Sequence, residues 1–101
     1  RFLPAPGDGP SPEAQRRGHF ELLLHGLNSS SGNTLRARVS GDRDPGYGAT
    51  SRMLGEAAVC LARDELDCGG GCWTPATALG EHLIRRLEQS AGMTFQVLAQ
   101  E

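Results

Sequence analysis

Two short runs that alternate apolar and polar residues constrain the fold of this chain more than any other feature. A period of two is typical of a strand with one apolar face. The turn-forming sequence NSSSGN separates the runs, so we expect an antiparallel hairpin with one buried and one polar face. The residues of the expected apolar face are Phe20, Leu22 and Leu24 in the first run and Leu35, Ala37 and Val39 in the second.

Two helices are predicted after the hairpin, because apolar residues then recur every three or four positions. The first covers about residues 48 to 63, and we expect a sheet to cover its apolar stripe. The second has Thr74 as N-cap, Pro75 at the first helical position and Gly92 as its stop. The predicted stripes are Met53, Leu54, Ala57, Ala58 and Leu61 in the first helix and Leu79, Leu83, Ile84 and Leu87 in the second.

A third alternating run closes the chain, with Met93, Phe95 and Val97 on one face. The order β, β, α, α, β predicts a two-layer α+β fold in which two helices lie on one face of a small antiparallel or mixed sheet. Three strands are too few to cover all of the apolar surface. Residues 1 to 18 hold four prolines and three glycines, so we expect an extended connector that tightens into a helical turn near residues 11 to 17. Residues 19 to 101 would then form the domain.

Composition excludes several classes of function. At 101 residues the chain can build one core. Its net charge is -2 and its arginines are dispersed, which argues against a nucleic-acid partner. It contains no lysine, which excludes a Schiff-base or P-loop lysine in this chain. No apolar run approaches the ~18 residues of a membrane span.

The first residue and the cysteines lead to two further expectations. The chain begins with an arginine rather than a methionine, so we expect a fragment or a processed product. Its three cysteines are odd in number and one lies in an apolar helical segment, which favours a reducing, cytoplasmic setting.

The glycine-rich stretch DPGYGATS, residues 44 to 51, allows three interpretations. It resembles a dinucleotide-binding turn, but Ser51 stands where the fingerprint needs Gly or Ala, and Asp44 would place a carboxylate beside a phosphate. The favoured interpretation is a tight turn that starts a helix. In the third, Tyr47, Thr50 and Arg52 contact a ligand held by another domain.

Cysteine and histidine residues offer weaker candidates. Cys68 and Cys72 flank three glycines, but no second closely spaced pair exists for a structural zinc site. Free loop thiols are favoured over zinc and over a disulfide, and we expect no metal. His19 and His25 are interpreted as polar surface of the first strand.

The segments GDRDPGYGATSRMLGEAAVCLA and GGGCWTPATALGEHLIRRLEQSAGMTFQV are similar to the C-terminal region of saccharopine dehydrogenase-like oxidoreductases, including the bacterial trans-acting enoyl reductases. The resemblance covers about residues 1 to 98. The sequence CGGGCW departs from the family pattern, which usually has an aliphatic or aromatic residue near Cys72.

This resemblance implies a longer protein with an N-terminal Rossmann domain that binds NAD(P) and is missing here. The present chain would bind no cofactor itself, would be inactive alone, and would complete the substrate side of the pocket. Substrate-side candidates are Tyr47, Thr50 and Arg52, and the catalytic residues stay unassigned. The alternative is a standalone, non-enzymatic module that binds a partner or forms a homo-oligomer through an open sheet edge.

Overall fold

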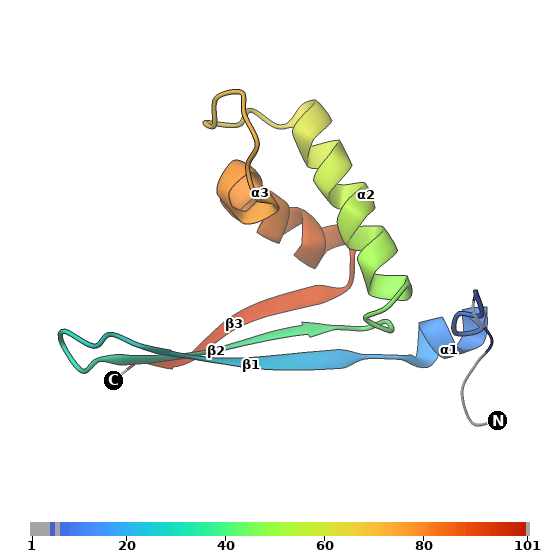
Figure 1. Cartoon of the computed structure of the whole chain (residues 1–101), viewed down its shortest axis with the longest axis horizontal. Coiled ribbons are helices and arrows are strands. Elements are labelled where there is room, and N and C mark those ends of the chain that lie inside the picture. The colour runs from blue at the N-terminus through green and yellow to red at the C-terminus, as the bar shows by residue number, and fades with distance from the viewer. Residues whose placement is uncertain (1–4, 6, 101) are drawn as a thin grey trace.

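The structure is a computed structural model that describes residue 5 and residues 7 to 100. The described residues form a three-stranded antiparallel sheet and three helices, so the predicted α+β fold and the order β, β, α, α, β are confirmed (Figure 1). In chain order the elements are α1 (Pro12–Arg17), β1 (Phe20–Leu27), β2 (Thr34–Gly41), α2 (Gly48–Arg63), α3 (Pro75–Ser90) and β3 (Met93–Gln100).

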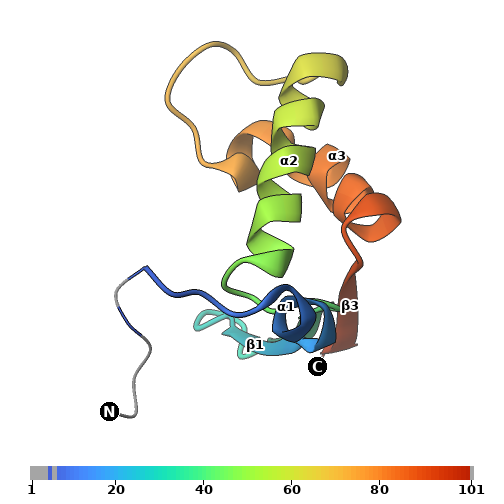
Figure 2. The same ribbon diagram turned by 90° about the vertical axis from the view of Figure 1, so that its right-hand side faces the viewer.

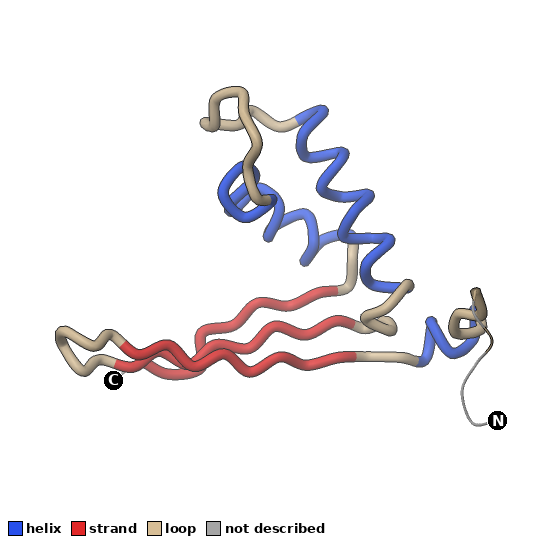
Figure 3. The backbone as a smooth tube through the Cα atoms, in the orientation of Figure 1, coloured by secondary structure: helices blue, strands red, loops and turns tan. Residues whose placement is uncertain are grey.

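The sheet has the strand order β1-β2-β3, and both neighbouring pairs are antiparallel (Figure 3). The hairpin register pairs Leu22 with Val39 and Leu24 with Ala37, which puts the alternating apolar residues on one face as predicted. In the hairpin loop the Asn28 side chain accepts hydrogen bonds from the backbone N–H groups of Ser30 and Ser31. The strands β1 and β3 are the two edges of this sheet.

The helices α2 and α3 lie over one end of one sheet face and leave its other end bare (Figures 1 and 2). The Thr74 hydroxyl caps α3 by accepting from the N–H of Thr77 at 3.3 Å, as the sequence predicts. Gly92 follows the helix with φ +69°, and an added Cβ would overlap the Asp42 carboxylate. Only glycine therefore fits this stop without strain. Gly80, with φ +48°, interrupts α3 near its start.

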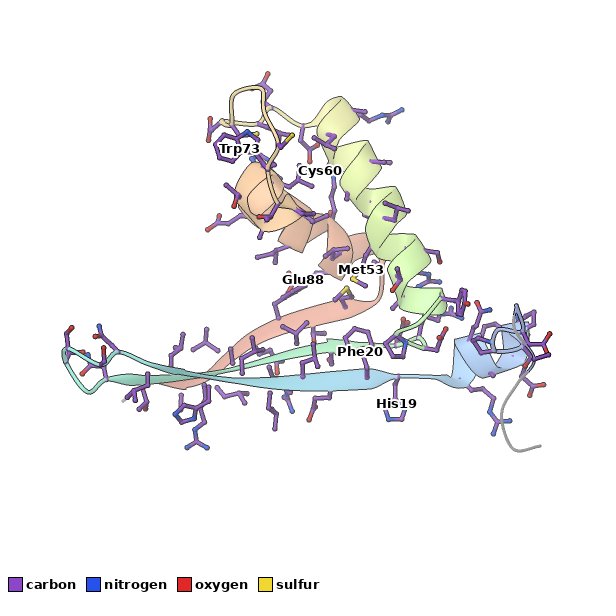
Figure 4. The ribbon with its side chains drawn as sticks, viewed as in Figure 1. His19, Phe20, Met53, Cys60, Trp73 and Glu88 are labelled. Atoms are coloured by element: carbon purple, nitrogen blue, oxygen red, sulfur yellow. The ribbon has the colours of Figure 1, made fainter. Side chains whose placement is uncertain are left out.

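The core lies where the covered end of the sheet meets α3 and the start of α2. Leu87, Ala91 and Met93 form its buried centre. Phe20 and Met53 approach this centre from the sheet and from α2 (Figure 4). The other side chains packed against it are Val39, Leu83 and Phe95.

Two expectations about burial were wrong. The apolar stripe of α2 meets the core only at Met53: Leu54 and Leu61 are 71% and 62% exposed, because α2 packs mainly on α3 and rises away from the sheet (Figure 2). The apolar face of β1 is not buried along its length either. Leu22 and Leu24 remain 57% and 50% exposed, because the helices cover only the end of the sheet near Phe20.

A buried cysteine and a two-bond ion pair join α2 to α3. The Arg86 guanidinium donates two hydrogen bonds to the Asp64 carboxylate, at 2.7 and 2.6 Å. These bonds hold the pKa of Asp64 well below its usual range. Cys60 is fully buried beside them, and burial raises the pKa of its thiol.

Leu87→Ala is expected to lower the free energy of unfolding by about 2–5 kcal/mol, because it opens a cavity in the core. The same substitution at Leu61, which is 62% exposed, should change it by about 0.5 kcal/mol or less. Urea unfolding followed by circular dichroism measures both variants. Equal losses would show that the core has been wrongly located.

Candidate functional site

The candidate site is the junction of α1 with the turn between β2 and α2. The helical turn predicted near residues 11 to 17 is α1, and α1 packs directly on the turn between β2 and α2. The backbone N–H of Asp44 donates to the carbonyl of Gln15 at 3.1 Å. A Cβ added to Gly18 would lie only 2.6 Å from the backbone N of Asp44. Backbone contact therefore fixes α1 beside the start of α2.

The glycine turn is organised by the side chain of Asp44. One carboxylate oxygen accepts from the N–H groups of Gly46 and Tyr47, at 3.0 and 3.1 Å, and the other accepts from Gly48 at 2.6 Å. Burial alone would raise the pKa of Asp44, but these three N–H donors outweigh it and the pKa is lowered. The carboxylate occupies the place that a phosphate takes in a dinucleotide-binding turn.

This geometry supports the interpretation of the stretch as a helix start. The strand before it, β2, pairs antiparallel with both of its neighbours, whereas a dinucleotide-binding turn follows a strand of a parallel sheet. The N–H groups at residues 46 to 48 already have an acceptor within the chain. An anion would have to displace Asp44 to reach them.

The three substrate-side candidates lie close together at the start of α2, but each has a local contact. Tyr47 is exposed, and its ring covers the backbone at Gly9. The hydroxyl of Thr50 donates to the carbonyl of Pro45 at 2.7 Å. Arg52 Nη1 lies 3.7 Å from Asp42 Oδ1. No contact here tests their role, which stays a prediction.

Two further arginines join Arg52 at this junction, and sequence reasoning missed them. Arg16 of α1 and Arg43 of the turn line the same pocket as Arg52, and the volume of this pocket is ≈ 230 Å³. The three arginines are far apart in sequence and carry no common motif. Only the docking of α1 brings them together, and the sequence gives no direct signal for that contact.

A larger, apolar cavity of ≈ 550 Å³ lies between α2, α3 and the loop that joins them. Leu54, Leu61 and Trp73 line it, which accounts for part of the exposed α2 stripe. The Trp73 indole N–H donates to the carbonyl of Gly69 at 3.0 Å and so closes the CGGGCW loop on itself. Trp73, which lines this cavity, lies away from the glycine turn (Figure 4).

The remaining candidates are dispersed. His19 comes just before β1 and points to the side opposite the helices (Figure 4), and His25 of β1 is also exposed. Cys68 and Cys72 are free thiols, as is Cys60. Within the described part of the chain, no three His, Cys, Asp or Glu side chains are placed to hold a metal ion. No described helix is long and apolar enough to cross a membrane.

Nearly the whole chain is similar to part of three mycobacterial proteins. A Mycobacterium tuberculosis (strain H37Rv) protein, provisionally named a trans-acting enoyl reductase, is 42% identical over 98 residues, which is 95% of this chain and 23% of the relative. Trans-acting enoyl reductases of Mycobacterium ulcerans and Mycobacterium bovis (strain BCG) are each 36% identical, over 89% and 86% of this chain and 22% and 21% of the relatives.

The chain thus spans about a quarter of the length of these curated relatives. No protein-family model matches the sequence. No solved structure matches it either. The names of these relatives agree with the predicted resemblance to trans-acting enoyl reductases.

Asp44→Asn is expected to lower stability at neutral pH, because the amide cannot accept three backbone N–H groups as a carboxylate does. The folded-state pKa of Asp44 is lowered, so its stabilisation is present above the ordinary value near 4 and is lost as pH falls through the folded-state value. Unfolding curves of the wild type and the variant should therefore differ at pH 7 and converge toward pH 2.

Asp67→Asn is the control, because it makes the same change of charge at an exposed loop position. Its unfolding curves should match those of the wild type at both pH 7 and pH 2. A constant difference between wild type and Asp44→Asn from pH 7 to pH 2 would contradict the assigned role of the carboxylate.

Proposed function

We propose that this chain is the C-terminal, substrate-side domain of an NAD(P)-dependent oxidoreductase of the enoyl reductase type, related to saccharopine dehydrogenase-like enzymes and acting in the cytoplasm. The observation that carries the proposal is the 42% identity over 98 residues to a protein named as an enoyl reductase. That relative is about four times as long as the matched region, which leaves ample length for a separate nucleotide-binding domain.

The glycine turn indicates which part of the proposed enzyme holds the cofactor. Its backbone N–H groups are bound by Asp44, so in this proposal the phosphates of the cofactor are held by a Rossmann domain outside this chain. The nicotinamide would supply the hydride. Tyr47, Thr50 and Arg52 would shape or orient the substrate from their positions at the start of α2.

The bare end of the sheet supplies a packing surface for the rest of such a protein. Leu22, Leu24 and Val97 lie on the same face as the core but beyond the cover of α2 and α3. The opposite face is mixed there, since Arg38 binds Gln96 at 2.6 Å and lies 3.5 Å from Glu21, while Leu23 is exposed beside them. The apolar face is therefore the one suited to burial against a further domain.

The chain alone should show no saturable binding of NADH, because the phosphate-binding backbone is proposed to lie elsewhere. Replacing the matched region of the M. tuberculosis relative with this chain should give a protein that binds NADH and reduces an enoyl thioester. Nicotinamide fluorescence and absorbance measure binding and turnover. Tight binding of NADH by the isolated chain would refute the proposal.

Leu22→Glu with Leu24→Glu should destabilise that chimera by about 3 kcal/mol or more, because two carboxylates without partners would be buried at the domain contact. In the isolated chain the same change should be nearly neutral, since both side chains are already exposed. Leu23→Glu is the matched control: Leu23 lies on the other face of the sheet, where it pairs with Arg38 of β2, and is 71% exposed.

Thermal unfolding of the chimera and of the isolated chain separates these cases. If the double replacement and the Leu23→Glu control destabilised the chimera equally, the proposed packing surface would be wrong. A stable dimer of the isolated chain in sedimentation, lost in the Leu22→Glu, Leu24→Glu variant, would instead support the standalone module.

A further inference from the structure

Three arginines from three different elements line one small pocket beside the glycine turn. Arg16 comes from α1, Arg43 from the turn after β2, and Arg52 from the start of α2. Gln15 and Ser51 add polar side chains to the same pocket. No Asp or Glu is among its lining residues in the described structure.

The positions of these arginines are set by backbone contacts. Gln15, next to Arg16, accepts a hydrogen bond from the N–H of Asp44, next to Arg43. The close approach of Gly18 to Asp44 holds the end of α1 at the same point. The fold therefore assembles the pocket and brings these three arginines to its lining.

The positive charge of the pocket is only partly balanced. Asp42 Oδ1 lies 3.8 Å from Arg43 Nε and 3.7 Å from Arg52 Nη1, both longer than a hydrogen bond. Arg43 Nε is buried and has no hydrogen-bond partner among the described residues. Asp44 is committed to the turn N–H groups. Arg43 and Arg52 thus share one loosely placed carboxylate, and among the described residues Arg16 has no ion pair.

We propose that the Arg16, Arg43 and Arg52 pocket binds the phosphoryl group of a phosphate monoester. Guanidinium groups match phosphate oxygens with paired hydrogen bonds, and several of them together suit a dianion. The volume of ≈ 230 Å³ is below the roughly 300–1,000 Å³ usual for a whole small molecule, which fits capture of a head group rather than of an entire ligand. This site stands independently of the proposed reductase function.

Calorimetric titration of the chain tests the proposal with inorganic phosphate and two phosphate monoesters, 2′-AMP and 4′-phosphopantetheine. Adenosine and pantetheine are the unphosphorylated counterparts. All three phosphates should bind at one site, more weakly at higher salt, and the counterparts should not bind. A monoester that binds more tightly than inorganic phosphate identifies its parent group, nucleoside or pantetheine, as the source.

Variants locate the site. Arg16→Gln, Arg43→Gln and Arg52→Gln should each weaken binding about tenfold, through loss of a charge-assisted hydrogen bond. Arg63→Gln, at the last residue of α2 and outside the pocket, makes the same change of charge and should leave binding unaltered. Asp42→Asn should strengthen binding, because it removes the competing carboxylate.

The gain expected for Asp42→Asn keeps the test decisive if an arginine variant unfolds, which circular dichroism would detect. No binding of any phosphate probe, or equal weakening by Arg63→Gln, would overturn the site. None of these measurements involves nicotinamide or turnover, so failure here leaves the proposed function untouched, and failure of the NADH experiment leaves this site untouched.

Discussion

The carboxylate of Asp44 is the contact on which the arrangement of the N-terminal half depends. Its side chain accepts from three consecutive N–H groups at the start of α2, and its backbone N–H donates to the carbonyl of Gln15 in α1. One residue thereby fixes the direction in which α2 leaves the sheet and the position of α1 beside it. This carboxylate also keeps the turn from binding a phosphate, because the N–H groups that could have held one already donate to Asp44.

The remainder of the fold depends on the pairing of the two long helices. Leu87 and Met93 connect α3 to the sheet, and the bonds between Arg86 and Asp64 connect α3 to α2. Because α2 packs on α3 more than on the strands, its exposed leucines border a cavity that the Trp73 loop also lines. The two-layer scheme is therefore correct at one end of the sheet and incomplete at the other.

Local signals in the sequence predicted local structure well. The alternation in β1 and β2, the cap at Thr74 and the stop at Gly92 each depend on short-range chemistry, and each is found where the pattern indicates. Burial was harder to predict, because the pattern at Leu54 or Leu22 shows which side is apolar but not what covers it. The pocket of Arg16, Arg43 and Arg52 depends on a contact between distant backbone segments, and periodicity carries no information about such contacts.

The edge strand β1 has a further consequence for the chain in isolation. Its outer backbone N–H and carbonyl groups have no neighbouring strand in the described sheet, and the exposed leucines Leu22, Leu23, Leu24 and Leu27 lie along it. Such an edge is a template for adding strands from other molecules, and neither proline nor lysine interrupts it. Concentrated preparations of the chain would therefore tend toward ordered aggregation through β1, and a charged residue on that strand is the natural way to keep the material soluble.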